Sequence, residues 1–154
     1  MSNLYLSLVN GIVPLVRGDG RVLAMRHNSA RENSPKQVIL AGGKLEADEF
    51  VDEGALRELA EETCVHVAPE DLEFCQLMHD KDTNGVRVIG TVFTTRRWQG
   101  EAHYAETGKH DAILWIDPAS PPADCRPYAR AVLASFNAGR LYTTLTVSAG
   151  GGTS

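Results

Sequence analysis

One acidic stretch places the strongest constraint on how this 154-residue chain can fold. Two glycines, Gly42 and Gly43, precede it, and its second half carries Arg57 followed by closely spaced glutamates. At about 100° per residue, the helical period, one side of this half is an apolar stripe. The stripe contains Ala55, Leu56, Leu59 and Thr63, and Glu58, Glu61 and Glu62 fall on the arc beside it. The stretch therefore predicts a glycine turn followed by an amphipathic helix with a carboxylate at the edge of its buried face.

These carboxylates destabilise the helix unless something binds them. Glu58 lies three residues before Glu61 and four before Glu62, and each such like-charged pair costs an isolated helix about 0.2–0.5 kcal/mol. Clustered carboxylates beside a backbone carbonyl suit Mg²⁺ or Mn²⁺, which prefer oxygen ligands. We therefore predict a divalent-cation site here. An ordinary helix with a solvated acidic face is the alternative.

The spacing also fits a longer pattern, G-x5-E-x7-R-E-U-x-E-E-x-G-U, in which U is a bulky apolar residue. The positions that match are Gly43, Glu49, Arg57, Glu58, Leu59, Glu61, Glu62 and Val65. One position departs, because Cys64 stands where the pattern has glycine. The stretch resembles the signature of the Nudix hydrolase superfamily.

The resemblance implies an α/β fold, an α/β/α sandwich with a mixed β-sheet between helices. It also implies hydrolysis of a nucleoside diphosphate joined to another group, by attack of water on the diphosphate with Mg²⁺ or Mn²⁺. The family pattern assigns the metals to Glu58, Glu61 and Glu62, helped by a carbonyl of the glycine turn, taken here as that of Gly43. One of these carboxylates would act as the general base or position it. Arg57 would hold them in place, because its guanidinium can pair bidentately, and Glu49 would be a further acid close to the metals.

A second, shorter resemblance is to the MutT-like nucleoside triphosphate pyrophosphohydrolases. It rests on Arg97-Trp98-Gln99-Gly100-Glu101, followed five residues later by Glu106. The resemblance implies that Glu106 completes the metal site or assists the base. A glutamate in a plain surface loop is an equal alternative, and Trp98 is expected to pack rather than to stack on a base.

Four residues are predicted to contact the substrate: Arg26, Arg31, Lys44 and Asp124. Arg26 and Arg31 belong to a basic, polar segment and could meet an anionic substrate, although solvated loop residues are as good an interpretation. Asp124 follows Pro121-Pro122-Ala123, near where MutT-like enzymes have an asparagine that reads oxidised guanine. An ionised carboxylate accepts hydrogen bonds but cannot donate them, so the same base specificity is not expected.

Composition narrows the class of protein. Apolar residues make up 43% and charged residues 23% of the chain, as in soluble globular proteins, and the length fits one domain at 1–148 with a flexible tail at 149–154. The formal net charge of −5 lacks the excess of basic residues that is typical of proteins that bind nucleic-acid polymers. We predict no signal peptide and no membrane span. Three cysteines without CxxC spacing favour a reduced, cytoplasmic protein without disulfides or zinc.

Turn signals and periodicity predict the order of elements. Strands are expected over residues 4–16, 21–26, 37–40, 72–80, 85–98, 112–116 and 141–147, with a second helix over 126–138 ending at Gly139. A turn at residues 17–20 makes the first two segments look like a hairpin, although Asn10-Gly11 inside the first leaves a bulge or an earlier turn open. Only this order follows from the residues, and the sandwich comes from the resemblance.

Two residues break local rules in the acidic helix. Gly54 costs about 1 kcal/mol relative to alanine inside a helix. Cys64 occupies a position where helices commonly end in a left-handed glycine, and a residue with a Cβ there costs about 1–2 kcal/mol. We expect this departure to affect stability more than chemistry, because the glutamates precede it.

The function favoured by these features is MutT-like, Mg²⁺-dependent hydrolysis of the diphosphate linkage in a nucleoside triphosphate or in another compound that joins a nucleoside diphosphate to a further group. One alternative is another diphosphate substrate, such as a nucleotide sugar or a biosynthetic intermediate. The other is a non-catalytic Nudix module that senses a nucleotide, but such modules typically lose the acidic ligands, and all three glutamates are present. The predicted partner is a small nucleotide or diphosphate. A homodimer, common in the family, is left open.

Overall fold

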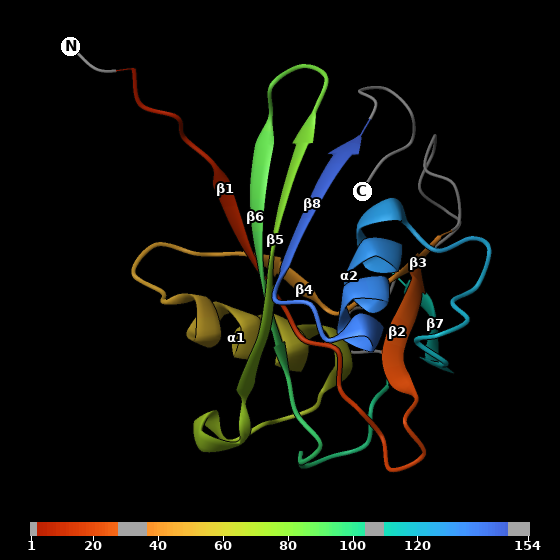
Figure 1. Cartoon of the computed structure of the whole chain (residues 1–154). Helices are drawn as coiled ribbons and strands as arrows, with labels where there is room; N and C mark the ends of the chain where they lie inside the picture. The colour runs from red at the N-terminus through yellow and green to blue at the C-terminus, as the bar shows by residue number, and fades with distance from the viewer. Residues whose placement is uncertain (1–2, 28–36, 104–109, 148–154) are drawn as a thin grey trace.

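The computed structural model describes residues 3–27, 37–103 and 110–147, and its strands form two sheets (Figure 1). The larger sheet has the order β4-β1-β6-β5-β8. It is mixed, because β1 with β6 and β5 with β8 are parallel pairs, whereas β1 with β4 and β5 with β6 are antiparallel. Its strands are β1 (Leu8–Ile12), β4 (Gly42–Lys44), β5 (Glu73–Asp82), β6 (Arg87–Thr94) and β8 (Tyr142–Val147).

The smaller sheet is antiparallel, with β2 in its centre. Its strands are β2 (Val22–His27), β3 (Val38–Ile39) and β7 (His110–Ile116). Two α-helices, α1 (Val51–Thr63) and α2 (Pro127–Ala138), and a short 3₁₀ helix, η1 (Pro69–Asp71), complete the fold. Helices α1 and α2 lie on different sides of the strands in Figure 1. The predicted mixed sheet between helices is therefore confirmed, with the sheet divided in two.

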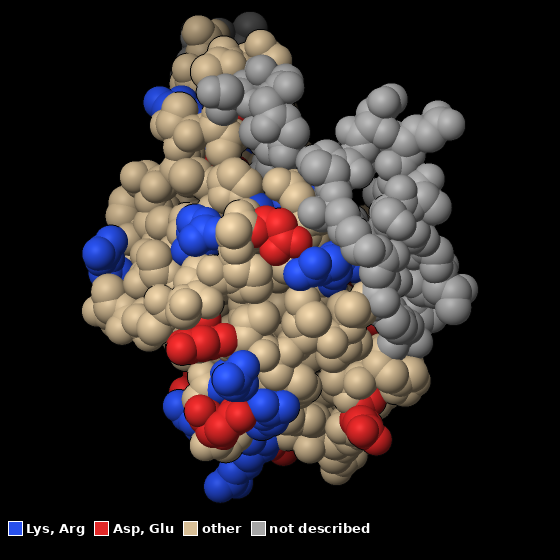
Figure 2. Space-filling view, turned by 90° about the vertical axis from the view of Figure 1, so that its right-hand side faces the viewer, with Lys and Arg blue, Asp and Glu red and all other residues tan. Residues whose placement is uncertain are grey.

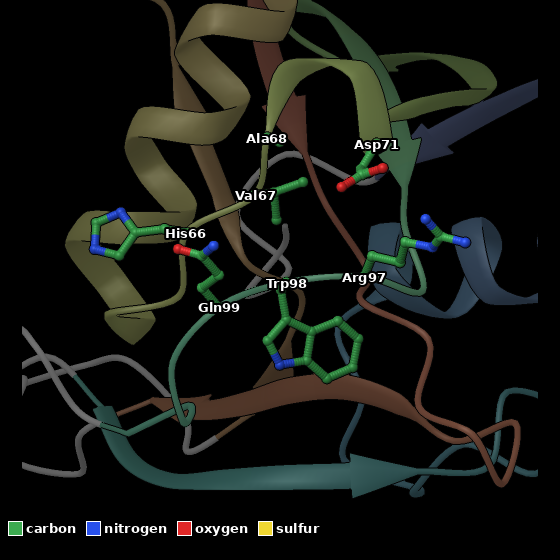
Figure 3. Close-up of a pocket in the computed structure, with 7 residues that line it drawn as sticks. All are labelled: His66, Val67, Ala68, Asp71, Arg97, Trp98 and Gln99. Carbon is green, nitrogen blue, oxygen red and sulfur yellow. The ribbon is translucent and has the colours of Figure 1, made fainter.

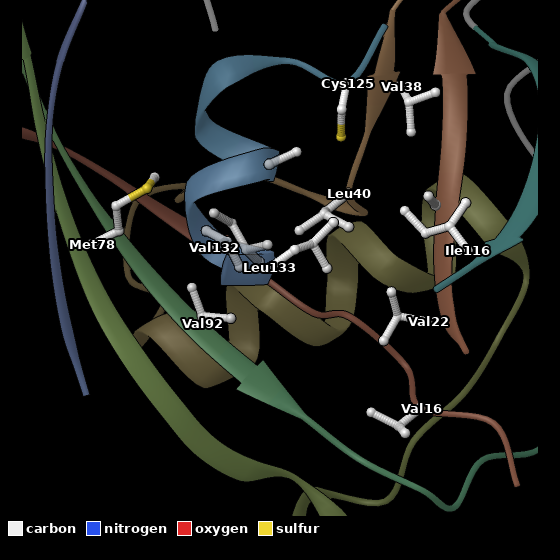
Figure 4. Close-up of a cluster of buried hydrophobic side chains, with 13 residues drawn as sticks. Val16, Val22, Val38, Leu40, Met78, Val92, Ile116, Cys125, Val132 and Leu133 are labelled. Carbon is white, nitrogen blue, oxygen red and sulfur yellow. The ribbon is translucent and has the colours of Figure 1, made fainter. Parts of the chain in front are cut away.

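Alternation along the strands supplies a hydrophobic core to each helix. In β2, Val22 and Ala24 belong to the core under α2, whereas Leu23 and Met25 belong to the core under α1. Figure 4 shows the first of these cores, in which Leu133 of α2 lies among side chains from both sheets. The same strands thus fix α1 and α2 relative to each other.

Two local predictions were wrong. Residues 4–26 do not form a hairpin within one sheet, since β1 and β2 belong to different sheets and an isolated bridge, Val16↔Val22, joins their segments. Pro14 follows β1 and has no N–H to continue a ladder, and beyond it Leu15 and Val16 contact both Thr95, just after β6, and the β2 segment. Gly42–Gly43 is not a turn but part of β4, which pairs with β1. Strand propensity reflects the packing of side chains on the sheet, and glycine has no side chain, so the two glycines gave no strand signal.

The remaining elements agree with the sequence to within a few residues at their ends. The second helix ends at Gly139 in the left-handed conformation with φ 70°, as predicted. The tail at 149–154 lies outside the described residues. On the face shown in Figure 2, basic and acidic side chains are interspersed rather than gathered in a patch of one sign. Within the described ranges, no helix is long and apolar enough to cross a membrane.

Candidate active site

Strand β4 forms the floor of the candidate site because its glycine allows α1 to approach closely. A Cβ on Gly43 would lie 2.5 and 2.7 Å from the two carboxylate oxygens of Glu58. Gly11, the partner of Gly43 in β1, lies equally close to the helix, since a Cβ there would be 2.8 Å from that of Ala55. The absence of a side chain at Gly11 and at Gly43 therefore lets α1 lie close to both strands, with the Glu58 carboxylate directly against the β4 backbone.

Glu62 is attached to the same strand from the buried side of α1. Only 7% of it is exposed, and its Oε1 accepts a 2.8 Å hydrogen bond from the Gly42 N–H. Just before β4, the Leu40 carbonyl oxygen accepts a 3.2 Å hydrogen bond from the hydroxyl of Tyr128, a residue of α2. Burial, with a smaller contribution from the charge of Glu62, raises the pKa of Tyr128, so this phenol stays neutral. Glu62 is thus a buried charge held in one orientation by a backbone donor.

Arg57 is the centre of the acidic cluster. Its Nε and Nη2 donate to the two oxygens of Glu49 at 2.6 and 3.0 Å, which is a bidentate pair. Its Nη2 also donates to the Lys44 carbonyl oxygen at 3.0 Å. These contacts join the end of β4 and the loop after it to the middle of α1. They also lower the pKa of Glu49 below its ordinary range, chiefly through the Arg57 hydrogen bonds.

The third nitrogen of the guanidinium meets three further carboxylates. Arg57 Nη1 lies 3.1 Å from Glu58 Oε1, 3.2 Å from Glu61 Oε2 and 3.5 Å from Glu46 Oε1. The hydrogen bonds to Glu49, more than the other contacts, raise the pKa of Arg57, so the guanidinium remains charged. One arginine therefore offsets the repulsion among four carboxylates that the sequence places together.

The carboxylates of the cluster are ligands of the type that binds a divalent cation, but their present arrangement does not surround a site for one. Among the described residues, no three His, Cys, Asp or Glu side chains are grouped so as to bind a metal ion. Glu58 and Glu61 instead converge on Arg57, and Glu62 binds the β4 backbone. Carboxylates around a glycine backbone that has no room for a Cβ are oxygen ligands of the type Mg²⁺ prefers. The side chain of Glu61 is 46% exposed and can rotate toward such an ion. The metal assignment to Gly43 and these glutamates stays a prediction.

The local departures in α1 have structural explanations. Cys64 ends the helix in the left-handed conformation, with φ 61° and ψ 17°, and its N–H bonds the Ala60 carbonyl oxygen at 3.0 Å. The chain therefore keeps the left-handed cap of the pattern's glycine and tolerates the Cβ. Gly54 is buried, and a Cβ there would collide with Leu45 and lie 3.1 Å from Glu49 Oε1. The helix accepts this glycine because the loop after β4 packs against it.

The predicted substrate residues are only partly brought together. Arg26 Nη1 of β2 forms an ion pair of 3.1 Å with Asp124 Oδ2, just before α2, and both side chains remain partly exposed. Lys44 is placed at the end of β4, where its carbonyl oxygen binds Arg57. Arg31 and Glu106 lie outside the described residues. Sequence reasoning proposed Arg26 and Asp124 separately and missed that they pair.

Two further residues of the site, Glu46 and Tyr128, were not predicted from the sequence. Glu46 belongs to no position of the matched pattern that specifies a residue, yet it contacts Arg57. Tyr128 comes from α2, and its approach to Leu40 depends on the tertiary fold. No signal in the sequence would have found Tyr128. An acid just after the glycines could have suggested Glu46.

Trp98 packs, as expected, and borders a separate hollow. Its ring stacks on that of Trp115 of β7, with centroids 5.8 Å apart. Figure 3 shows the ring pointing toward β2 and β7, with Arg97 and Asp71 on one side of the hollow and His66 on the other. The cavity measures about 430 Å³ and contains none of the acidic residues of α1. It is therefore distinct from the carboxylate cluster.

Comparison with known proteins gives the same fold. The MutT NUDIX hydrolase from Burkholderia pseudomallei superposes with a TM-score of 0.73 at 24% identity, over 84% of this chain and 98% of that chain. The MutT protein from Methanosarcina mazei Go1 has a TM-score of 0.71 at 18% identity, over 89% and 97%. The mMutator MutT protein from Bacillus halodurans has a TM-score of 0.69 at 18% identity, over 92% of this chain and 91% of that chain. At these identities the likeness shows the fold.

Sequence comparison identifies the family. No curated protein sequence matches the chain. The profile of the NUDIX domain, however, matches residues 8–136, which include the glycines of β4 and the whole acidic helix. The chain therefore belongs to the Nudix family of pyrophosphohydrolases.

Proposed function

We propose that the protein hydrolyses the diphosphate linkage of a nucleoside triphosphate, with Mg²⁺ as its cation and Mn²⁺ as a substitute. Nudix enzymes act on small diphosphate compounds and typically use a divalent metal, so the substrate is what the proposal adds. The observation that supports catalysis is the Arg57 cluster, in which Glu49, Glu58 and Glu61 are held beside the β4 backbone. A nucleotide-sensing module would not need to retain it.

The residues of the cluster would divide the work. When bound, the cation would neutralise charge on the diphosphate and lower the pKa of an attacking water. Glu58, Glu61 and Glu62 would hold it, with the Gly43 carbonyl as a further ligand. Arg57 would act as a positioning residue, since a guanidinium that stays charged cannot take a proton. One carboxylate of the cluster would accept the proton of the attacking water.

The substrate assignment rests on residues outside α1. The segment Arg97–Glu101 with Glu106 supports a nucleoside triphosphate, and Glu106 would join the metal site or assist the base. The ion pair of Arg26 with Asp124 supports recognition of a polar group, because it presents donors and acceptors side by side at 3.1 Å. Arg31 and Lys44 would add positive charge for the phosphates.

A substrate panel with matched variants tests the proposal. Nucleoside triphosphates, nucleotide sugars and dinucleoside polyphosphates would be incubated with Mg²⁺, and released phosphate and pyrophosphate measured separately. The variant is Glu62→Gln, which keeps an oxygen for the Gly42 N–H but removes the charge. The control is Glu70→Gln, an exposed position in η1.

We expect release of pyrophosphate from a triphosphate, a loss of roughly 10²-fold or more in kcat for Glu62→Gln, and no change for the control. Faster turnover of a nucleotide sugar would reassign the substrate. Nucleotide binding without turnover of any diphosphate would refute the enzymatic function.

A further inference from the structure

A cavity of about 310 Å³ lies on the larger sheet, and none of its lining residues belongs to α1 or β4. Three adjacent strands line it: β5 with His79 and Lys81, β6 with Arg87, and β8 with Thr144 and Thr146. Asp80 and Leu145 also border the cavity. Because side chains alternate along a strand, these two direct theirs to the opposite face of the sheet and contribute backbone. The side chains on the cavity face are therefore basic or hydroxyl-bearing.

The strand register places two cations directly opposite each other. Lys81 of β5 pairs with Arg87 of β6 on one side and with Thr146 of β8 on the other. Like charges at directly opposed positions destabilise a sheet. Within the described ranges neither Lys81 nor Arg87 forms an ion pair with an acid. An anion between them would turn this repulsion into two attractive contacts.

The neighbouring groups are suited to such an anion. The Arg87 guanidinium lies over the Tyr5 ring, with its central carbon 4.5 Å from the ring centre. Such a cation–π contact is compatible with N–H hydrogen bonds from the same guanidinium to an anion. Two residues before Lys81, His79 is opposite Thr144, and its Nε2 is buried with no hydrogen-bond partner among the described residues. A buried polar atom without a partner is uncommon in native proteins and often marks a missing ligand or water.

We propose that this cavity binds an oxyanion of the phosphate class, at a site separate from the acidic cluster. Lys81 and Arg87 provide the charge, and the hydroxyls of Thr144 and Thr146 provide neutral donors. Free inorganic phosphate, pyrophosphate and the phosphate of a nucleotide share this chemistry. The proposal does not depend on hydrolysis, because the site needs neither the carboxylates of α1 nor a metal.

Binding is measured on the full chain in EDTA, because without a cation the carboxylates of α1 repel anions and competition from the candidate active site is weakened. Phosphate, pyrophosphate and AMP are titrated at constant ionic strength set with chloride, and backbone amide shifts and the melting temperature are recorded. The variants are Lys81→Gln and Arg87→Gln. The matched control is Arg140→Gln, an exposed arginine after α2.

We expect the amides of β5 and β8 around the cavity to shift with saturation, and phosphate to raise the melting temperature. Each variant weakens binding by roughly tenfold or more, as for the loss of a charged hydrogen bond, while circular dichroism and nucleotide hydrolysis stay unchanged. Tighter binding of pyrophosphate than of AMP would identify a free anion as the ligand, and the reverse would identify a nucleotide phosphate. Shifts confined to α1, equal effects of chloride, or an equal loss in Arg140→Gln would overturn the proposal.

Discussion

Replacing Cys64 with glycine tests the strain at the end of the acidic helix. Cys64 is left-handed, with φ 61°, a conformation that costs a residue with a Cβ about 1–2 kcal/mol. Glycine avoids this cost but loses about 0.4–1 kcal/mol more backbone entropy on folding than alanine. Taking mid-range values, Cys64→Gly should be more stable than Cys64→Ala by about 0.8 kcal/mol. For a chain of this size that is a difference of about 2–3 °C in melting temperature.

Urea denaturation of the two variants measures this difference, and the alanine reference removes the effect of losing the Cys64 sulfur. Gly139→Ala, at the other left-handed cap with φ 70°, should destabilise by a similar amount. Turnover should stay unchanged in Cys64→Gly, because Glu58, Glu61 and Glu62 all precede the cap. A Cys64→Gly protein no more stable than Cys64→Ala would refute the reasoning.

Three further outcomes follow from the site. Gly43→Ala adds a methyl group 2.5 and 2.7 Å from the Glu58 carboxylate oxygens, and the displaced carboxylate should lower kcat by roughly 10²-fold, measured by product release beside the melting temperature. The pKa of Glu49 is lowered by Arg57, so its contribution to stability is present above its unfolded pKa and is lost as the pH falls through its folded pKa. The melting temperature of Glu49→Gln should therefore fall less than that of the parent between roughly pH 5 and pH 3, and an equal fall would contradict the assigned pairing. Removal of divalent cations with EDTA should abolish turnover while leaving circular dichroism unchanged, and activity that persists would refute the metal assignment.

The acidic helix was predictable because its information is local. Helical periodicity placed the glutamates beside the apolar stripe, and the glycine of the pattern marked Cys64 as the end of the helix. Whether the turn adapts or the chain tolerates a left-handed Cys64 could not be decided from the sequence, and the structure shows the left-handed cap. Local propensity gives only the cost of Gly54 inside a helix, and a tertiary requirement outweighs that cost, since Leu45 occupies the space of a Cβ.

The parts that escaped prediction depend on contacts between distant segments. Gly42 and Gly43 form a strand because they pair with β1, and this pairing cannot be predicted from the two glycines themselves. The Arg26–Asp124 pair joins β2 to the segment before α2, so it exists only once both sheets are assembled. The place of Arg31 and Glu106 relative to the cluster stays a prediction.

Arg57 explains how so acidic a helix is stable before a cation binds. It holds Glu49 through two parallel hydrogen bonds, whereas Glu58 and Glu61 both contact a single nitrogen, Nη1, at 3.1 and 3.2 Å. A cation entering between Glu58 and Glu61 would therefore compete with that nitrogen, and Glu49 would keep the guanidinium in place. A carboxylate can also accept from Arg57 through one oxygen while it binds a metal through the other. The arrangement separates two tasks: Glu49 fixes the arginine, and the arginine keeps the proposed ligands within reach of the β4 backbone.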